Sequence, residues 1–260
     1  MKFVQRTLGN AAEVSSGRDS ARRDYIRIAL FIVLGIVVVN ALIWATVEVG
    51  VRFISVQREA ALFSFIGGEN DGASELTLYR ETLEKLREHP DVPPYPYRLL
   101  LLEEEEPNAF AIIGGAIGVT KGLVEALEDD EIAIAFLIGH ELGHFANRDH
   151  LRGAGRALLL AGCQSIVFPR GGGDLMGGLT YNAIVTAYSR KQEEQADRFG
   201  LRLVYDYYGE ADGATRLLER LREKHKIPEW AYMFTTHPGP DRRIQLLQQE
   251  LERITAEEEN

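Results

Sequence analysis

The longest uninterrupted apolar stretch of the chain is residues 28–47, IALFIVLGIVVVNALIWATV, which contains no charged side chain. As an α-helix these residues rise about 30 Å, which matches the hydrocarbon thickness of a bilayer. A buried core helix of this length usually carries a polar stripe, whereas Asn40 is the only strongly polar residue here. A cleaved signal peptide would have a shorter apolar region and a briefer basic leader. The pattern therefore predicts a single-pass transmembrane signal anchor, with the lipid bilayer as its partner.

The charges on the two sides of this segment predict its orientation. The N-terminal tail, residues 1–27, contains six basic and three acidic side chains, a net charge of +3. On the other side the first charges are mixed, with two arginines and two glutamates at residues 48–59. Basic residues favour the cytoplasmic side of a membrane. We therefore expect a cytoplasmic N-terminus and a large C-terminal part that lies outside the cytoplasm.

Helical patterns dominate the rest of the chain, and two short apolar runs interrupt them. Residues 48–73 are expected to continue as a linker helix, and the amphipathic sequence SELTLYRETLEKLRE at residues 74–88 predicts a further helix. The runs YRLLLLEE and NAFAIIGGAIGVT are bounded by Pro and Gly and predict a hairpin or small antiparallel sheet. From Lys121 onward the expected helices are at residues 123–127, 131–148, 180–207 and 212–224, followed by a charged C-terminal helix. The expected fold class is α+β, mainly α.

Two later segments are not expected to form further membrane spans. The apolar run ALLLAGCQSIVF, residues 157–168, is too short to cross a bilayer and is typical of a buried or interfacial helix. The sequence RGGGDLMGGL, residues 170–179, lacks the Gly-Lys-Ser/Thr ending of a phosphate-binding loop and is interpreted as a flexible connector. The expected organisation is a basic tail at 1–27, the anchor at 28–47, the linker helix at 48–73 and one large domain at 74–260.

Composition excludes several classes of function. The formal net charge is -10, and the residues after the basic tail carry -13, so nucleic acid is not an expected partner. Cys163 is the only cysteine, so neither an intrachain disulfide nor a cysteine-based zinc site can form. Any metal site in this chain must therefore be built from histidines and carboxylates.

The strongest chemical signal is the His-Glu-x-x-His pattern of His140, Glu141 and His144, within the helix expected at residues 131–148. Positions i and i+4 of a helix lie on one face about 6 Å apart, so both imidazoles can reach one zinc ion. Glu141 points about 100° away from His140 and can reach a water molecule at that ion. The surrounding sequence is strongly apolar, and burying these polar groups is costly unless they find partners. A metal is such a partner, and the alternative is a hydrogen-bonded pair of core histidines.

A catalytic zinc site needs a third protein ligand and an open position for water. Three other histidines lie in unsuitable contexts, namely a chain break, a helix end and a basic run: His89, His150 and His225. The segment SRKQEEQADRFG places Glu193 and Asp197 at i, i+4 on a predicted helix. One of these carboxylates could bind zinc, and the other could accept a hydrogen bond from a ligating histidine. Glu194 is a competing ligand, and a solvated helical face is the alternative interpretation of the whole cluster.

Three longer segments follow one another in order: NAFAIIGGAIGVTKGLVEALEDDEIAIAFLIGHELGH, SRKQEEQADRFGL and HPGPDRRI. Together they resemble the HtpX-like and CAAX-prenyl-protease family of membrane-linked zinc metallopeptidases, including its Oma-type and BepA-type members. The resemblance covers roughly residues 74–250, and an ordered set is much more specific than the five-residue pattern alone. It implies a zincin-like metallopeptidase domain of the gluzincin type that holds one Zn²⁺ per chain.

The resemblance also implies a role for each residue of the site. His140, His144 and Glu193 match the zinc ligands of the family, so Glu193 takes precedence over Glu194 as the third ligand. Glu141 matches the catalytic general base. Asp197 matches the hydrogen-bond partner of a ligating histidine.

Two further family positions concern the substrate. His237, in a His-Pro pair, matches a position near the active site and is expected to stabilise the developing oxyanion, with helix capping or packing as the alternative role. The strand that contains Asn108, Ala109 and Phe110 resembles the edge strand on which the family lays out the substrate backbone by β-addition.

The chain departs from the family in its membrane segments. HtpX-type members carry additional membrane helices around the catalytic motif, whereas this chain shows one clear crossing. Prenyl-protease members work inside a large multi-helix chamber that 260 residues cannot build, so a prenylated substrate is not expected.

The implied function is that of a membrane-anchored zinc-dependent endopeptidase that cleaves polypeptides, such as misfolded membrane or envelope proteins, in protein quality control. The alternative from another class is a zinc-stabilised, membrane-tethered chaperone or adaptor without proteolysis. Such a structural site is usually closed by four protein ligands, and three plausible ligands favour catalysis. A further alternative is a latent peptidase held shut by a loop such as residues 170–179.

Overall fold

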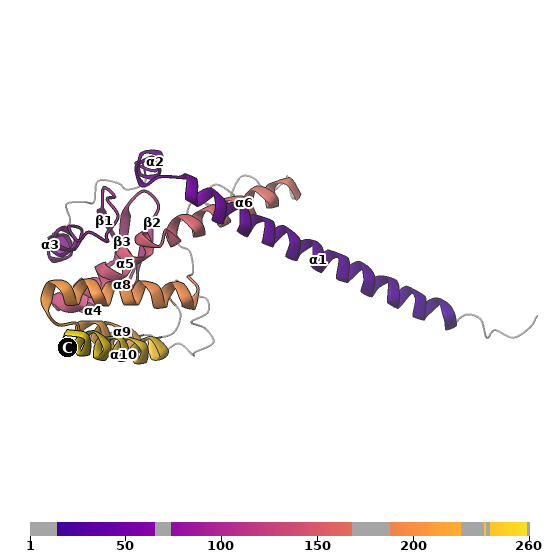
Figure 1. Cartoon of the computed structure of the whole chain (residues 1–260). Coiled ribbons are helices and arrows are strands. Elements are labelled where there is room, and N and C mark those ends of the chain that lie inside the picture. Colours follow the sequence, from indigo (N-terminus) through magenta and orange to yellow (C-terminus); the bar gives the residue numbers. More distant parts are fainter. Residues whose placement is uncertain (1–14, 66–73, 168–187, 225–236, 238–239, 259–260) are drawn as a thin grey trace, which may run out of the picture. The chain divides into compact units, whose positions relative to one another are not determined.

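The computed structural model describes residues 15–65, 74–167, 188–224, 237 and 240–258 (Figure 1). The chain divides into two compact units, Met1–Thr46 and Val47–Asn260. The connector expected at residues 170–179 lies outside the described residues, as do residues 1–14 of the basic tail and 180–187 of the helix expected at 180–207. The described helix in that region begins only at Arg190, where Ser189 caps it.

The first unit consists of most of helix α1, Ser15–Phe53, whose last turns belong to the second unit. Among the described helices, its segment Ala21–Phe53 is the one long and apolar enough to cross a membrane, with mean hydropathy 2.8 in its most apolar window. The apolar side chains of this segment are largely exposed. The amide of Asn40 donates to the carbonyl of Ile36 at 2.9 Å, so this polar group has a partner within the helix, as a lipid environment requires. A helix over the segment expected at residues 28–47 is therefore confirmed.

The second unit contains a sheet of three strands in the order β1-β3-β2. The strands are β1 (Arg98–Leu102), β2 (Ala109–Ile112) and β3 (Ala116–Thr120). β2 and β3 both come from the run NAFAIIGGAIGVT and form an antiparallel hairpin, whose turn contains Gly114 and Gly115 at φ +86° and +95°, a conformation that favours glycine.

β1 pairs with β3 in parallel, so the sheet is mixed, which corrects the expectation of an antiparallel sheet. The connection between β1 and β2, residues 103–108, contains four glutamates and a proline and is too long for a tight hairpin turn. β1 therefore pairs with β3 and not with the next strand along the chain. As a result β2 lies at one edge of the described sheet.

The helices of the second unit follow in chain order: α2 (Val56–Leu62), the 3₁₀ turn η2 (Ser74–Leu76), α3 (Thr77–Leu86), α4 (Lys121–Leu127), α5 (Glu131–Ala146), α6 (Asp149–Val167), α8 (Arg190–Tyr208), α9 (Gly213–Lys224) and α10 (Pro240–Glu258). The expectation of a mainly helical α+β fold is thus confirmed. The helix expected at residues 131–148 ends at Ala146, because Arg148 adopts a φ of +57°, which an α-helix does not accommodate.

Helix α5 forms the centre of the second unit, and every residue from Ala133 to Phe145 is buried. It packs against α3, α6, α8, α9 and β2. This surrounding explains why its sequence is apolar on all sides and shows no polar stripe. Figure 1 shows the sheet beside α5, with α8, α9 and α10 stacked below it.

The segment that follows the anchor packs into this unit. Val47 and Val51, in the last turns of α1, are buried in a cluster with Phe110 and Ala154. Glu59 on α2 is fully buried. The described residues of the linker expected at 48–73 therefore lie in the same compact unit as the domain expected at 74–260.

The apolar run at residues 157–168 falls in the second half of α6. Leu158, Leu159 and Leu160 are exposed there, so this run is not a buried core helix. The interfacial alternative stays a prediction.

Candidate metal centre

The His-Glu-x-x-His residues lie in the middle of α5, deep in the second unit. Asp130, just before the helix, caps its N-terminus, because the Asp130 carboxylate accepts a hydrogen bond from the amide of Ala133 at 3.1 Å. His140, Glu141 and His144 are only 3%, 1% and 0% exposed. The two histidines project from one face, and their Nε2 atoms lie 3.2 Å apart. Helical spacing thus brings both imidazoles to one point, as the sequence predicts.

Helix α8 reaches this point because the two helices meet through residues without bulky side chains. A Cβ atom added to Gly143 on α5 would lie 2.9 Å from Cα of Ala196 on α8. A Cβ added to Gly200 on α8 would lie 2.7 Å from the backbone nitrogen of His140. No side chain fits at either position without moving a helix backbone. The close approach lets short carboxylate side chains on α8 reach the histidines of α5.

Glu193 is the α8 side chain that reaches both histidines. Its Oε1 lies 3.4 Å from Nε2 of His144, and its Oε2 lies 3.7 Å from Nε2 of His140. The carboxylate is 1% exposed. Glu194, the competing ligand, instead pairs with Arg242 at 3.1 Å and is partly exposed. The geometry therefore agrees with the choice of Glu193 over Glu194.

His237 joins this group from a distant part of the sequence. Its Nδ1 lies 2.9 Å and 3.0 Å from the two oxygens of Glu193 and 3.3 Å from Nε2 of His140. Its Nε2 lies 3.1 Å from the carbonyl oxygen of Ala109 on β2. The residue expected near the active site thus lies between the α5–α8 pair and the edge strand.

The four side chains His140, His144, Glu193 and His237 form a group that could hold one metal ion, since each offers a ligand atom and these atoms lie within 4.8 Å of one another. Ligands bound tetrahedrally to zinc at about 2.0–2.1 Å stand roughly 3.3 Å apart. The separations of 3.2, 3.4 and 3.7 Å within the set of His140, His144 and Glu193 fit this geometry. Imidazoles with one carboxylate are also the donor set that suits zinc.

Asp197 holds His140 in the orientation that a ligand needs. Its Oδ1 lies 2.9 Å from Nδ1 of His140, which leaves Nε2 facing the other ligand atoms. Burial lowers the pKa of His140, which favours the neutral imidazole, the form that binds a metal. Asp197 therefore lies where the sequence predicts it, within hydrogen-bond distance of His140 on the side away from the other ligand atoms.

Arg243 on α10 is a residue of this site that the sequence reading did not identify. Its guanidinium donates to both oxygens of Asp197, at 2.7 and 2.6 Å, and approaches Glu193 at 3.0 Å. Burial alone would raise the pKa of Glu193, but the charges of His237 and Arg243 hold it well below its usual value. Arg243 lies in the HPGPDRRI segment, which carries part of the family resemblance and could have indicated this residue. The local sequence does not show which of its two arginines faces the site.

Asp149, at the start of α6, supports His144 in the same way and was also missed. Its Oδ2 lies 3.1 Å from Nδ1 of His144, and its Oδ1 accepts a hydrogen bond from Gln192 at 2.6 Å. Burial opposes charge on His144, but the bonds to Asp149 and Glu193 outweigh it and raise its pKa to about 9. Metal binding at His144 must therefore displace a proton. The ring of Tyr188 stacks on His144 at 3.8 Å and completes its surroundings.

Glu141 is buried beside the metal-ligand group but belongs to a different face of α5. Its Oε1 lies 3.7 Å from Nε2 of His237. Its Oε2 is buried and has no hydrogen-bond partner among the described residues. A buried carboxylate oxygen without a protein partner is costly in a purely structural role, and a general base needs such an oxygen to accept a proton from water.

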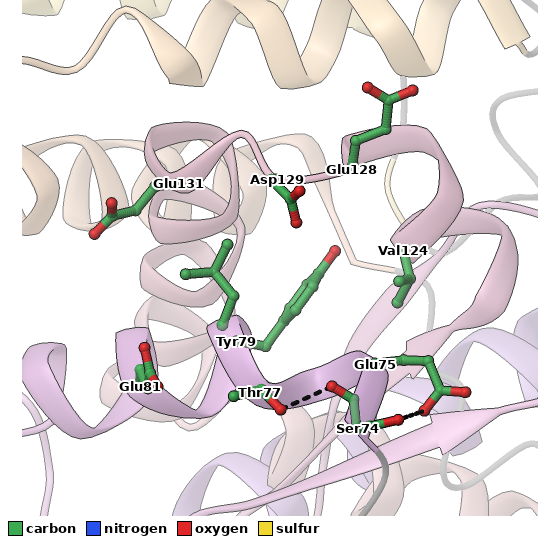
Figure 2. A pocket seen from close by; sticks show the side chains of 10 residues that line it. Ser74, Glu75, Thr77, Tyr79, Glu81, Val124, Glu128, Asp129 and Glu131 are labelled. Atoms are coloured by element: carbon green, nitrogen blue, oxygen red, sulfur yellow. Dashed lines mark hydrogen bonds between the residues drawn. The ribbon is translucent and has the colours of Figure 1, made fainter.

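A cavity of about 580 Å³ lies elsewhere on the second unit, between η2, α3, the end of α4 and the start of α5 (Figure 2). Its lining contains five carboxylates: Glu75, Glu81, Glu128, Asp129 and Glu131. Figure 2 shows these side chains pointing in different directions, with Glu75 on one side of the cavity and Glu81 and Glu131 on the other. Since the carboxylates do not converge on one point, this cavity has the character of a solvated acidic surface, and the chemistry lies at the histidine cluster.

Comparison with known proteins assigns the part of the chain that contains the histidine cluster to a family. The model for "Peptidase family M48" matches residues 75–251. Over 193 residues the chain is 30% identical to the protease HtpX homolog of Salinibacter ruber. The matched region covers 66% of this chain and 68% of that protein. It is 29% identical over 153 residues to the mitochondrial metalloendopeptidase OMA1 of Arabidopsis thaliana, and 26% identical over 193 residues to the beta-barrel assembly-enhancing protease of Escherichia coli. The matches cover 59% and 65% of this chain but only 31% and 37% of those two longer proteins.

Asp149 gives a direct test of the metal-ligand group. Replacing it by Asn removes the negative charge that orients His144, so we expect the affinity for zinc to fall by about 10- to 100-fold. The affinity is measured by competition with a chromogenic chelator. Glu194→Gln, which changes a neighbouring carboxylate that faces Arg242, is the matched control and should bind zinc like the unchanged protein. Equal zinc affinity in Asp149→Asn and the control would contradict the proposed role of Asp149.

Proposed function

Because the chain belongs to peptidase family M48, whose members are zinc metallopeptidases, we propose that it is a membrane-anchored zinc-dependent endopeptidase. The observation that carries this proposal is the buried convergence of His140, His144 and Glu193 beside Glu141, one oxygen of which has no hydrogen-bond partner among the described residues. In this proposal the first three side chains hold one Zn²⁺, Glu141 is the general base, and Asp197, Asp149 and Arg243 keep the ligands in place.

The proposed reaction is hydrolysis of a peptide bond. His140, His144 and Glu193 would hold the zinc ion, which would supply a water of lowered pKa and polarisation of the scissile carbonyl. Glu141 accepts a proton from the attacking water at Oε2, which has no partner in the described part of the chain, and then delivers the proton to the leaving amine. His237, which lies 3.7 Å from Glu141, is proposed to donate a hydrogen bond to the developing oxyanion.

The edge strand β2 is proposed to align the substrate backbone. Both backbone groups of Asn108 already bind Thr120. The Asn108 amide donates to the hydroxyl of Thr120, and the Asn108 carbonyl accepts from the amide of Thr120. In an antiparallel pair such positions alternate, so Phe110 also faces β3, whereas Ala109 and Ala111 turn their backbone groups outward. The contact of the Ala109 carbonyl with His237 agrees with this alternation. We therefore assign substrate pairing to Ala109 and Ala111, and leave Asn108 and Phe110 the role of holding the strand in the sheet.

The substrates are proposed to be misfolded membrane or envelope proteins. Two observations support a site near a membrane: the apolar helix α1 precedes the peptidase unit, and the relatives include a protease HtpX homolog and a beta-barrel assembly-enhancing protease. The basic tail favours a cytoplasmic N-terminus and a peptidase unit on the opposite side of the membrane.

A second candidate function is a zinc-stabilised, membrane-tethered chaperone or adaptor without proteolysis. The position of His237 favours it, since a fourth ligand atom in the same group is typical of a closed, structural site. The two functions differ in whether His237 leaves a position free for water. Substitution of Glu141 and of His237 separates them.

Glu141→Gln is the decisive variant for the peptidase. It preserves shape but cannot accept the proton, so we expect about one bound zinc and a loss of casein cleavage by a factor of about 10²–10⁴. The assay uses the full chain in detergent, with and without chelator, because a fragment that starts after α2 would lack the buried Glu59. Glu194→Gln is the control and should cleave normally. Cleavage retained by Glu141→Gln would eliminate the mechanism, and zinc without cleavage in the unchanged protein would favour the chaperone.

His237→Ala tests the role of the fourth side chain. If His237 stabilises the oxyanion, the variant should retain zinc through the three other ligands and lose about 10²–10³-fold in kcat. Zinc content and kcat are measured on the same preparation. A rise in activity would show instead that His237 closes the site, and a loss of zinc would show that it is a structural ligand.

The proposed orientation is tested in intact spheroplasts. A protease added outside should digest the peptidase unit and leave a fragment that contains the N-terminal tail and α1. An epitope at each end of the chain identifies the products on a blot. Protection of the C-terminal epitope until the membrane is broken would show the opposite orientation.

A further inference from the structure

Glu59 is a fully buried charge that takes no part in the metal-ligand group. It lies on α2, a short helix just after the membrane anchor, and is 0% exposed. Burial of a carboxylate is costly unless its oxygens are hydrogen-bonded. Here each oxygen faces two donors: Oε1 faces the amide of Gly114 at 3.1 Å and Nε2 of His150 at 2.7 Å, whereas Oε2 faces the hydroxyl of Tyr95 at 2.7 Å and the guanidinium of Arg148 at 2.9 Å. The carboxylate is thus fully satisfied.

Two of these donors, Arg148 and His150, come from the segment just after α5, the helix that carries His140 and His144. Arg148 follows Asn147, the C-cap of α5, and has a φ of +57°, a strained conformation for a residue with a side chain. Its guanidinium also donates to the carbonyl of Ile54, just before α2. The other ring nitrogen of His150 lies 3.4 Å from the carbonyl of the ligand residue His144. Glu59 therefore holds the segment that ends α5 and leads into α6.

Another donor belongs to the turn of the edge strand. The amide of Gly114 lies between β2 and β3, in the turn that ends the proposed substrate strand. A Cβ on Gly114 would lie 2.9 Å from both Cβ and the carbonyl oxygen of Phe63, the residue that caps α2. Phe63 packs in the same apolar cluster as Phe110 and Ile112 of β2. Helix α2 therefore contacts the tip of the β2–β3 hairpin, as Figure 1 also shows.

The fourth donor is the hydroxyl of Tyr95, in the segment before β1. The ring of Tyr95 packs against Phe145 and His150, with ring centroids at 5.1 and 5.8 Å, and its Cβ lies beside Gly115 of the β2–β3 turn. These are contacts of the ring and Cβ, which phenylalanine would keep, whereas the hydroxyl itself adds a hydrogen bond from the segment before β1. Burial pushes the pKa of Glu59 up, but the hydrogen bond from His150 and the other donors bring it down to about 2, so the charge is present at all physiological pH values.

We propose that Glu59 is a positioning residue that fixes the edge strand β2 relative to the metal-ligand helix α5, and thereby places the geometry of the site under the control of the segment that leaves the membrane anchor. One carboxylate binds the strand turn through Gly114 and the end of α5 through Arg148 and His150. Since substrate on β2 must meet the metal ligands of α5, this spacing sets the alignment of the scissile bond. The inference rests on the proposed peptidase function for its catalytic readout.

The test compares Glu59→Gln with Tyr95→Phe in the full chain. In Glu59→Gln the amide nitrogen faces two donors in either orientation, so the connection between strand turn and helix end is disturbed while the shape remains. We expect kcat/KM on a peptide substrate to fall by about 10- to 100-fold, as a misplaced substrate predicts. We also expect a change in the visible absorption spectrum of Co²⁺ bound in place of zinc. Tyr95→Phe removes one hydrogen bond to Glu59 and should lower Tm while leaving kcat/KM and the Co²⁺ spectrum unchanged.

The outcomes separate a positioning role from a merely structural one. If Glu59→Gln lowers Tm but leaves both kcat/KM and the Co²⁺ spectrum unchanged, the proposal is wrong. If Glu59→Gln does not fold, Arg148→Met replaces it, since this variant keeps three donors to Glu59 and should show the same two changes. If the unchanged protein cleaves no peptide, the proposed peptidase function fails, and the Co²⁺ spectra of the two variants still decide whether Glu59 positions the site.

Discussion

The close approach of α5 and α8 is the constraint on which the site depends. At this crossing the residues on the facing surfaces are glycine and alanine, and an added Cβ at Gly139 or Gly143 would come within about 3 Å of the backbone of α8. Any larger side chain would separate the helices, and coordination distances tolerate only about ±0.2 Å. The separation that a single methyl group would impose is thus larger than the tolerance of the ligand set. The chemistry of His140 and Glu193 therefore depends on residues that have no functional group at all.

The same crossing creates an electrostatic problem that the surrounding elements solve. Close packing buries Glu193 and Asp197 in an apolar core, and both pKa values are held below their usual range, so both carboxylates carry charge. Arg243 from α10 is a cation that contacts both. Once metal binding displaces the proton from His144, the two carboxylates outnumber this one cation, and a divalent cation complements the excess negative charge. The helix that supplies Arg243 is thus as necessary to the centre as the two helices that carry the ligands.

The parts of this fold and site that could be predicted from sequence are those that local spacing determines. The apolar run of α1 and the i, i+4 spacings of His140 and His144 and of Glu193 and Asp197 each follow from the geometry of one helix. Spacing left Glu193 and Glu194 as rival ligands, because both lie on the same helix and only the tertiary structure decides which face is buried. Asp149 and Arg243 were missed for a related reason, since their partners come from other elements.

Two features of the chain path could also not be predicted from the sequence, and the physical reason differs from the one given for Asp149 and Arg243. After residues 103–108 the chain continues into β2, yet β1 pairs in parallel with β3. The apolar pattern of a strand does not specify which other strand it pairs with. The end of α5 depends on the positive φ of Arg148, a conformation that its own residue type disfavours. Such strain persists only where the surroundings hold it, and here the guanidinium of Arg148 is held by Glu59 and Ile54.

This dependence explains why the residues after the anchor do not behave as a simple tether. Glu59 can be buried only if donors from before β1, from the β2–β3 turn and from the start of α6 all reach it together. Conversely, Arg148 and His150 would be left with unpaired polar groups in the interior if α2 were displaced, and such a loss costs about 3–5 kcal/mol for a buried ion pair. Helix α2, the hairpin turn and the end of α5 must therefore form as one cooperative unit. The proposed metal ligands His140 and His144 lie on α5, and the edge strand ends at that turn, so under this proposal the site inherits the cooperativity of the segment that follows α1.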